Sequence, residues 1–141
     1  MEKFYVASSI GNMGAVNYVT KQLVNRGYVH TYDWTKNAYA SEEEKLTIED
    51  LKGIGQHEKN AIIESDFVVV ILPGGKGTHI EIGIALGLGK KIFLYSPDRA
   101  VDQVETTSTF YHLPAVEKCY GTLDELVDKI AAQMLLSQEI S

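Results

Sequence analysis

The chain has 141 residues, a formal net charge of −6 and one cysteine. This length fits a single domain over residues 1–141 with one hydrophobic core, and the scattered lysines form no basic stripe for nucleic acid or an anionic membrane. A lone cysteine forms no internal disulfide, and neither a signal peptide nor a long apolar segment is apparent, so we expect a cytoplasmic protein without membrane spans.

The first half of the chain alternates apolar runs with helical patterns. Residues 3–8, KFYVAS, predict a buried strand, and a helix is expected from about Asn12 to Arg26. Residues 28–34, YVHTYDW, predict the second strand. A further helical pattern starts near Ser41, a candidate N-cap, and runs to residue 65. Glycines at positions 53 and 55 interrupt this pattern, which favours two helices over one.

The second half continues the alternation. Residues 66–72, DFVVVIL, are nearly all apolar, as expected of a strand buried on both faces at the sheet centre. A helix then runs to about Gly89, and residues 90–96 and 115–120 predict two more strands. Residues 123–136 predict an amphipathic final helix.

This order of elements predicts an α/β fold. Five strands joined by helices favour a flavodoxin-like or Rossmann-like domain of three layers, with a five-stranded parallel sheet in the order 2-1-3-4-5. Ligands of such sheets bind at the carboxyl ends of the strands where the order reverses, here between the first and third strands. The loops ASSIGN and LPGGKGT follow these two strands, so we expect them to meet at a pocket.

The glycine-rich loop contains two overlapping patterns. Gly74, Gly75 and Gly77 allow ligand atoms to approach backbone amides closely. Thr78 and Glu81 also fit a capping box, in which each side chain binds a free backbone amide. The same spacing recurs at residues 41 and 44 and at residues 122 and 125. Spacing alone therefore leaves open whether Glu81 is a reactive carboxylate or a helix cap.

Two segments carry a family resemblance. Residues 4–12, FYVASSIGN, and residues 64–92, which include PGGKGTHIEIGIALGLGKK, resemble the nucleoside 2-deoxyribosyltransferase superfamily and its deoxyribonucleoside monophosphate N-glycosidase branch. PGGKGTHIE is also similar to a signature of cytokinin-activating phosphoribohydrolases. Both groups act on the bond between sugar C1′ and a nucleobase, and they differ in the sugar.

The resemblance implies roles for three side chains. Glu81 matches the nucleophile, a carboxylate that traps C1′ as a covalent glycosyl ester. Tyr5 matches a tyrosine that positions this nucleophile; on its own it also fits a core aromatic. Glu58 lies on or beside the position of a family aspartate and can act as the acid for the departing base, or it is a solvated charge on a helix.

The substrate contacts are expected on the loops. Ser8, Ser9, Gly11 and Asn12 match the loop that holds the sugar or its 5′ end, although such residues are also common in strand-to-helix turns. The glycine loop and Thr78 would line the same pocket. Asp33 and Trp34 end the second predicted strand and would contact the base; a surface tryptophan with no ligand role is the alternative.

Three departures from the families limit the implied activity. Gly75 stands where deoxyribosyltransferases carry an aspartate, which favours hydrolysis over transfer. Gly11 stands where the monophosphate glycosidases carry an arginine, and the arginine of the phosphoribohydrolases is also missing. Cleavage of a nucleoside or a nucleoside 5′-monophosphate is the leading hypothesis. A non-catalytic nucleotide-binding or sensing protein and a phosphoribohydrolase are the alternatives.

No metal or organic cofactor is expected, since the four histidines show no metal-binding spacing. The partner is expected to be a small nucleoside or nucleotide. By resemblance, we also expect a homodimer or larger homo-oligomer, with residues 104–112, VETTSTFYH, as a lid or interface segment.

Overall fold

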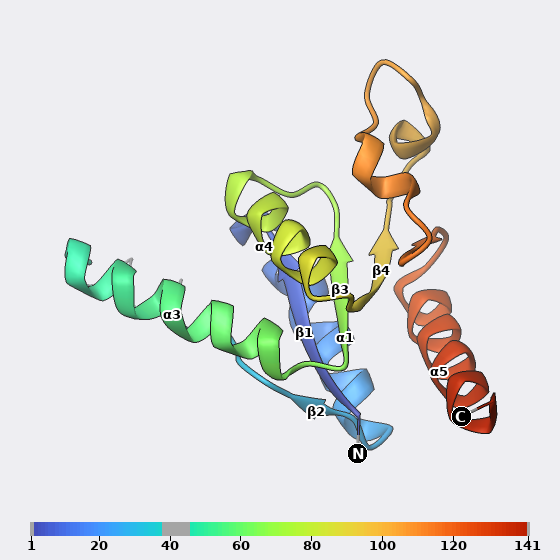
Figure 1. The fold of residues 1–141 in the computed structure, drawn as a ribbon, viewed down its shortest axis with the longest axis horizontal. Helices are drawn as coiled ribbons and strands as arrows, with labels where there is room; N and C mark the ends of the chain where they lie inside the picture. Colours follow the sequence, from blue (N-terminus) through green and yellow to red (C-terminus); the bar gives the residue numbers. More distant parts are fainter. Residues whose placement is uncertain (1, 38–45, 141) are drawn as a thin grey trace.

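A parallel sheet forms the centre of the computed structural model, which describes residues 2–37 and 46–140. Its strands are β1 (Lys3–Ser8), β2 (Val29–His30), β3 (Phe67–Ile71), β4 (Lys91–Tyr95) and β5 (Val116–Cys119). They are arranged in the order β2-β1-β3-β4-β5 (Figure 1). This arrangement confirms the predicted α/β fold and strand order.

The pairing of β1 with β3 sets the position of the functional loops. The two strands run in register from Phe4 beside Phe67 to Ser8 beside Ile71. All five residues of β3 are buried, as its apolar run predicts for a central strand. Because the strands are parallel and end side by side, the loops that follow them begin at the same edge of the sheet.

Four longer helices cover the two faces of the sheet (Figure 1). They are α1 (Met13–Asn25), α3 (Ile48–Glu64), α4 (Lys76–Gly87) and α5 (Leu123–Ile140), and the short helix η1 (Ile10–Asn12) precedes α1. Helices α1 and α5 contact each other, as do α3 and α4, so each pair forms one outer layer. Among the described residues, none of the helices is long and apolar enough to cross a membrane.

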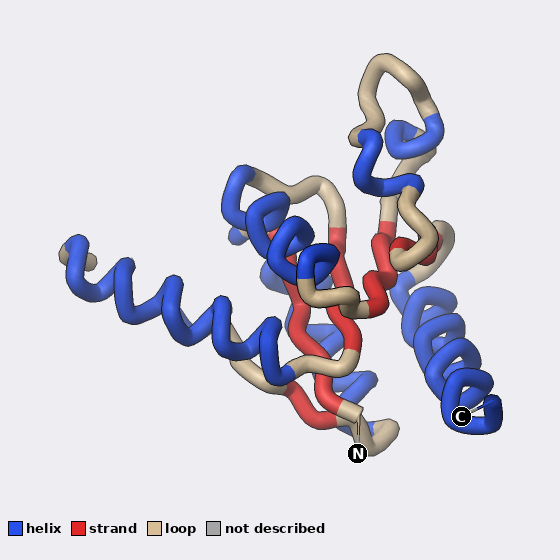
Figure 2. The backbone as a smooth tube through the Cα atoms, in the orientation of Figure 1, coloured by secondary structure: helices blue, strands red, loops and turns tan. Residues whose placement is uncertain are grey.

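The connection between β4 and β5 projects beyond the sheet, and we call residues 96–113 the arm (Figure 2). It contains two short helices, η2 (Ala100–Asp102) and η3 (Thr109–His112). Their presence shows that this segment is folded on itself. Part of residues 104–112, expected to be a lid or interface segment, therefore has regular structure.

The second strand is much shorter than the predicted 28–34. Only Val29 and His30 pair with β1, because β2 is the edge strand and the chain leaves the sheet at once. Trp34 turns inward instead, and its indole Nε1 donates to the carbonyl of Val6 at 2.7 Å. Burial of one large aromatic side chain therefore outweighs the extension of an edge strand.

The predicted break at Gly53 and Gly55 is also wrong, since α3 is one continuous helix. A Cβ added at either glycine would meet no atom within 4 Å, so both positions lie on an open face. The helix starts from a capping box between Thr47 and Asp50. Each helical glycine costs about 1 kcal/mol relative to alanine, which weakens a helix without ending it. The candidate cap Ser41 lies outside the described residues.

Candidate active site

A pocket of about 420 Å³ opens at the carboxyl edge of the sheet, where the loops after β1 and β3 meet. This volume falls in the usual range for small-molecule sites, and the place is the switch point predicted from the sequence. The lining residues from the loops after β1 and β3 are mostly serine, threonine or glycine, whereas those from α3 and the residue Leu46 before it are mostly apolar. Its lining residues are Ser8, Ser9, Ile10, Trp34, Asn37, Leu46, Leu51, Ile54, Glu58, Gly75, Gly77, Thr78 and Glu81.

Tyr5 links the two carboxyl groups of this pocket. The tyrosine lies in the middle of β1 and its side chain is fully buried. Its hydroxyl lies 2.5 Å from Oε2 of Glu81 on α4 and 3.2 Å from Oε2 of Glu58 on α3. A tyrosine hydroxyl has one hydrogen, so it can donate fully to only one carboxylate at a time. The shorter distance assigns that hydrogen to Glu81.

This arrangement raises the pKa of both carboxyl groups. Burial raises the pKa of Glu81 to about 8, with the hydrogen bond from Tyr5 acting in the opposite direction and Glu58 raising it again. Burial also raises the pKa of Glu58, partly offset by its hydrogen bonds. The pKa of Tyr5 lies far above its usual value, because burial and both carboxylates disfavour a phenolate. Near neutral pH Glu81 is therefore protonated in a large part of the molecules.

Glu81 does not cap its helix. Helix α4 begins at Lys76 after the N-cap residue Gly75, which has no side chain to bind an amide. Glu81 is thus the sixth residue of the helix, beyond the first turn, and its carboxyl contacts Tyr5 instead. The same sequence spacing does form a cap at α5, where Thr122 and Glu125 exchange hydrogen bonds of 3.0 and 3.2 Å. The capping interpretation of Glu81 is therefore wrong.

The glycine loop brings α4 close to β3. A Cβ at Gly74 would lie 2.5 Å from Cγ2 and 2.7 Å from Cβ of Thr78, so only glycine fits there without displacement. Thr78 itself is 3% exposed. Gly75 and Gly77 line the pocket and have open space where a Cβ would be. Gly74 therefore sets the packing of the helix start, whereas Gly75 and Gly77 leave room in the pocket.

The loop after β1 is tied to the loop after β3 by side-chain hydrogen bonds. The hydroxyl of Ser8 donates to the carbonyl of Ile71 at 2.6 Å, and the hydroxyl of Ser9 donates to the carbonyl of Pro73 at 3.1 Å. Asn12 donates to Ser8 Oγ at 3.0 Å and to the Pro73 carbonyl at 2.9 Å. Ser8 and Ser9 line the pocket, whereas Asn12 and Gly11 stand behind them and do not.

The two residues expected to contact the base are separated by the structure. Trp34 is 8% exposed and lines the pocket, held in place by its hydrogen bond to Val6. Asp33 does not line the pocket, because its Oδ1 accepts from the amide and the hydroxyl of Thr35. This local turn explains an aspartate at this position without a ligand.

The apolar outer side of the pocket was not predicted. Leu51 and Ile54 lie on α3 seven and four residues before Glu58, a spacing that places all three side chains on one helical face. Asn37 also lines the pocket, and its Nδ2 donates to the hydroxyl of Tyr32 at 2.6 Å. If this segment is treated as one helix, the sequence spacing alone predicts that Leu51, Ile54 and Glu58 share a face.

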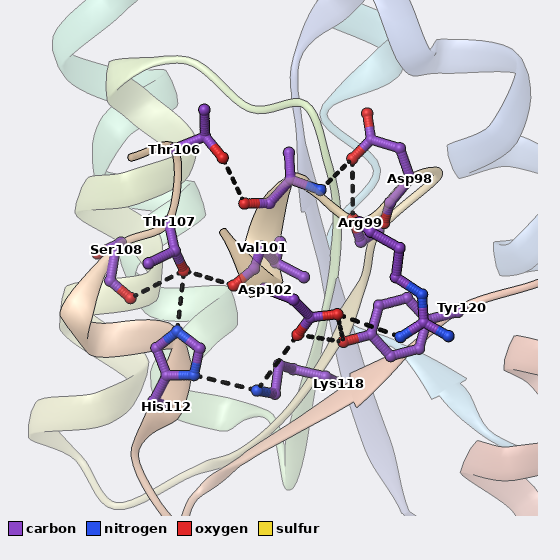
Figure 3. A network of polar contacts seen from close by, with 12 residues as sticks. Asp98, Arg99, Val101, Asp102, Thr106, Thr107, Ser108, His112, Lys118 and Tyr120 are labelled. Atoms are coloured by element: carbon purple, nitrogen blue, oxygen red, sulfur yellow. Dashed lines mark hydrogen bonds and ion pairs between the residues drawn. The ribbon is translucent and has the colours of Figure 1, made fainter. Parts of the chain in front are cut away.

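A second polar network fixes the arm to β5 (Figure 3). The carboxylate of Asp102 accepts from the hydroxyl of Tyr120 at 2.9 Å and from Arg99 at 3.1 Å, and it lies 3.8 Å from the ammonium of Lys118. The ammonium donates to Nδ1 of His112, 3.0 Å away. This network holds the arm and does not contact Glu81.

The described residues contain no group of three or more His, Cys, Asp or Glu side chains that could hold a metal ion. His79 follows Thr78, but it lies away from the pocket. Its Nδ1 is 2.8 Å from the carbonyl of Gly75, which can only accept, so Nε2 accepts from the hydroxyl of Tyr111 at 2.6 Å. Among the described residues of the pocket wall, the carboxyl groups are those of Glu58 and Glu81, and both contact the hydroxyl of Tyr5.

The chain is similar to known proteins in sequence and in fold. Residues 4–113, most of the chain, match the family described as nucleoside 2-deoxyribosyltransferase. Among solved structures, the fold is similar to that of the CMP N-glycosidase BcmB of Clostridium botulinum, with a TM-score of 0.59, 19% sequence identity, and coverage of 92% of this chain and 99% of that one. The search of curated proteins found no match. The protein therefore belongs to the nucleoside 2-deoxyribosyltransferase family of enzymes.

Proposed function

We propose that the protein cleaves the N-glycosidic bond of a nucleoside or a nucleoside 5′-monophosphate. The observation that supports this most strongly is the placement of Tyr5 between Glu81 and Glu58 at the pocket, in a chain of this family. The similarity of fold to a CMP N-glycosidase is consistent with it. Two carboxyl groups that contact the same tyrosine hydroxyl can provide a nucleophile and an acid.

In the proposed reaction, a carboxylate oxygen of Glu81 attacks C1′ as the bond from C1′ to the base nitrogen breaks. The electron pair of that bond goes to the base, and Glu58 supplies the proton that neutralises it. The product is a glycosyl ester of Glu81. Glu58 then takes a proton from a water molecule as the water oxygen bonds to C1′, and the bond from C1′ to the Glu81 oxygen breaks with its electron pair returning to the carboxylate. The free sugar leaves, and the two carboxyls are restored.

Tyr5 would stabilise the carboxylate form of Glu81 by donating its hydrogen. That donation matters because Glu81 holds a proton in much of the free protein near neutral pH, given its pKa of about 8. Substrate binding must shift this proton towards Glu58, where it is needed for the leaving base. We propose that water, and not a second base, accepts the sugar, because position 75 in the pocket wall is a glycine and provides no carboxyl group.

A chromatographic assay for released base tests this function. The panel comprises ribonucleosides, deoxyribonucleosides and their 5′-monophosphates, incubated with wild type, Glu81→Gln and the exposed control Glu105→Gln. We expect base release by wild type and the control only. Release by Glu81→Gln at the wild-type rate would contradict the nucleophile assignment. Binding without release in all three proteins would support a nucleotide sensor instead.

We also propose that the chain forms a homodimer or a larger symmetric assembly. The arm exposes apolar side chains at Val104, Phe110 and Leu113, and a groove of about 520 Å³ lies between it and α4. Burial of such a patch commonly drives self-association. Light scattering during gel filtration should give at least twice the 15.6 kDa chain mass. A monomeric mass at micromolar concentration would contradict this.

A further inference from the structure

The ionisable groups that line the active-site pocket are acidic. Of the described residues that form its wall, Glu58 and Glu81 are the ones that titrate, and lysine, arginine and histidine are absent from that set. Lys76 lies between two lining glycines, but its side chain is exposed and outside the wall. A sugar 5′-phosphate carries a charge of about −1.5 to −2 at neutral pH, which this wall does not neutralise.

Both arginines of the chain are committed elsewhere. Arg26, at the end of α1, pairs with Asp128 on α5 at 2.6 Å. Arg99, in the arm, pairs with Asp102 at 3.1 Å and stacks on the ring of Tyr120, with 3.8 Å between the guanidinium carbon and the ring centre. Neither lines the pocket. Guanidinium groups can bind a phosphate through two hydrogen bonds. Here both of them instead form contacts between helices or within and beside the arm.

The pocket has a distinct polar end. Trp34, Leu51 and Ile54 provide an apolar surface suited to a base, and Glu81 must lie beneath C1′ in the proposed reaction. The 5′ end of the sugar then points towards the serine and glycine loops.

At this polar end the two serine hydroxyl oxygens are available to a ligand only as hydrogen-bond acceptors. Ser8 and Ser9 each give their single hydrogen to a carbonyl of the β3 loop. A phosphate offers only acceptor atoms, so a serine oxygen whose hydrogen is already used repels it. A free 5′-hydroxyl can donate to Ser9 Oγ and still accept from a first-turn amide of α4.

We propose that the pocket selects a substrate with a free 5′-hydroxyl over the same compound with a 5′-phosphate. This inference rests on the proposed function and narrows its substrate class to uncharged nucleosides. It contrasts with the CMP N-glycosidase whose fold the chain shares. First-turn amides of a helix attract anions, but here they face a pocket with two carboxyls and no cation among the described wall residues.

The test compares each nucleoside with its 5′-monophosphate in two measurements. The first is kcat/KM for base release by wild type. The second is calorimetric binding to Glu81→Gln, which does not depend on turnover. We expect a preference of about tenfold or more for the best nucleoside over its monophosphate.

Each outcome separates this inference from the proposed function. Base release with equal or better use of the monophosphate overturns the inference and leaves the function standing. No base release, with nucleosides bound about tenfold more tightly, supports the inference and contradicts the function. No binding of either ligand at millimolar concentration overturns the inference.

A gain-of-binding variant provides a further check. Gly75 lines the pocket and has open space at its Cβ position, so Gly75→Arg would add the missing cation. Gly87→Arg, at the exposed far end of α4, is the matched control. We expect Gly75→Arg, but not Gly87→Arg, to improve monophosphate binding about tenfold. If Gly75→Arg folds and gives no gain, the charge argument fails; if it does not fold, the wild-type comparison decides.

Discussion

The hydroxyl of Tyr5 lies 2.5 Å from Oε2 of Glu81, although 76 positions separate the two residues in the chain. The contact exists because β1 and β3 pair in register and α4 begins just after β3. Tyr5 also reaches Glu58 on the neighbouring helix, at 3.2 Å. A buried tyrosine on a central strand thereby links two carboxyl groups from different helices, the proposed nucleophile Glu81 and the proposed acid Glu58.

Tyr5→Phe should lower the rate of base release and change its dependence on pH. The hydrogen bond from Tyr5 lowers the pKa of Glu81, so its loss raises that pKa and leaves less carboxylate at a given pH. We expect kcat to fall about tenfold or more, with a smaller change in KM, and the acidic limb of the profile to move to higher pH.

The control for this variant is Tyr111→Phe, which removes another largely buried tyrosine hydroxyl, bonded to His79 on the other side of α4. Its kcat/KM profile should match that of wild type. An unshifted acidic limb in Tyr5→Phe would contradict a role for the hydroxyl in setting the charge of Glu81.

Glu58→Gln should lower the rate of hydrolysis most for substrates with poor leaving groups. Without the proposed acid, a departing nucleobase lacks its proton, and we expect a loss of about 100-fold or more. A 4-nitrophenyl riboside or deoxyriboside needs little protonation, so its hydrolysis should fall far less. The exposed Glu64→Gln on the same helix is the control. Equal losses on both substrate types would show that Glu58 is not the acid.

The strand order and the meeting of the two loops could be predicted from the sequence because both depend on long-range regularities. A run such as FVVVI must be buried on both faces, and parallel strands place their following loops at one edge. The resemblance then identified Tyr5, Glu58 and Glu81, which the structure brings together. Their roles in catalysis stay predictions until the variants are measured.

Local features were predicted less well because packing outweighs local preference. Gly53 and Gly55 do not break α3, since a capping box starts the helix and both positions face open space. That error hid the apolar wall formed by Leu51 and Ile54, which requires a continuous helix. Asp33 ended a supposed strand in the sequence, but its carboxylate forms a local turn with Thr35.

Glu81→Gln should stabilise the fold increasingly as pH rises. Burial raises the pKa of Glu81 from 4.5 to about 8, so the folded state retains a proton that the unfolded chain releases. The contribution of the Glu81 carboxyl to the free energy of unfolding is fully present below about pH 4.5 and is lost as pH rises through 8. Glutamine carries no charge at any pH. The Tm difference between variant and wild type should be small at pH 5 and about 5 °C at pH 9.

Thermal unfolding at both pH values measures this difference, with the exposed Glu105→Gln as control. The control should shift Tm little at either pH. A Glu81→Gln effect that stays constant with pH, or that lowers Tm at pH 9, would show that the folded protein does not raise the pKa of this carboxyl.

Two neighbouring glycines should respond differently to the same substitution. In Gly74→Ala, the new methyl group would lie 2.5 Å from Cγ2 and 2.7 Å from Cβ of Thr78, and the latter cannot rotate away. The start of α4 must therefore move, at a cost of about 1–3 kcal/mol in the free energy of unfolding. In Gly75→Ala the methyl meets nothing within 4 Å, and its φ of −89° suits any residue, so we expect a change within about 0.5 kcal/mol.

Urea unfolding followed by circular dichroism compares the two variants. Because Glu81 lies on the helix that Gly74→Ala displaces, this variant should also lose base release per folded molecule, whereas any loss in Gly75→Ala would come from the pocket alone. Equal stabilities would mean that the helix start accommodates the methyl group without moving. The close approach at Gly74 would then not be what places Glu81 against Tyr5.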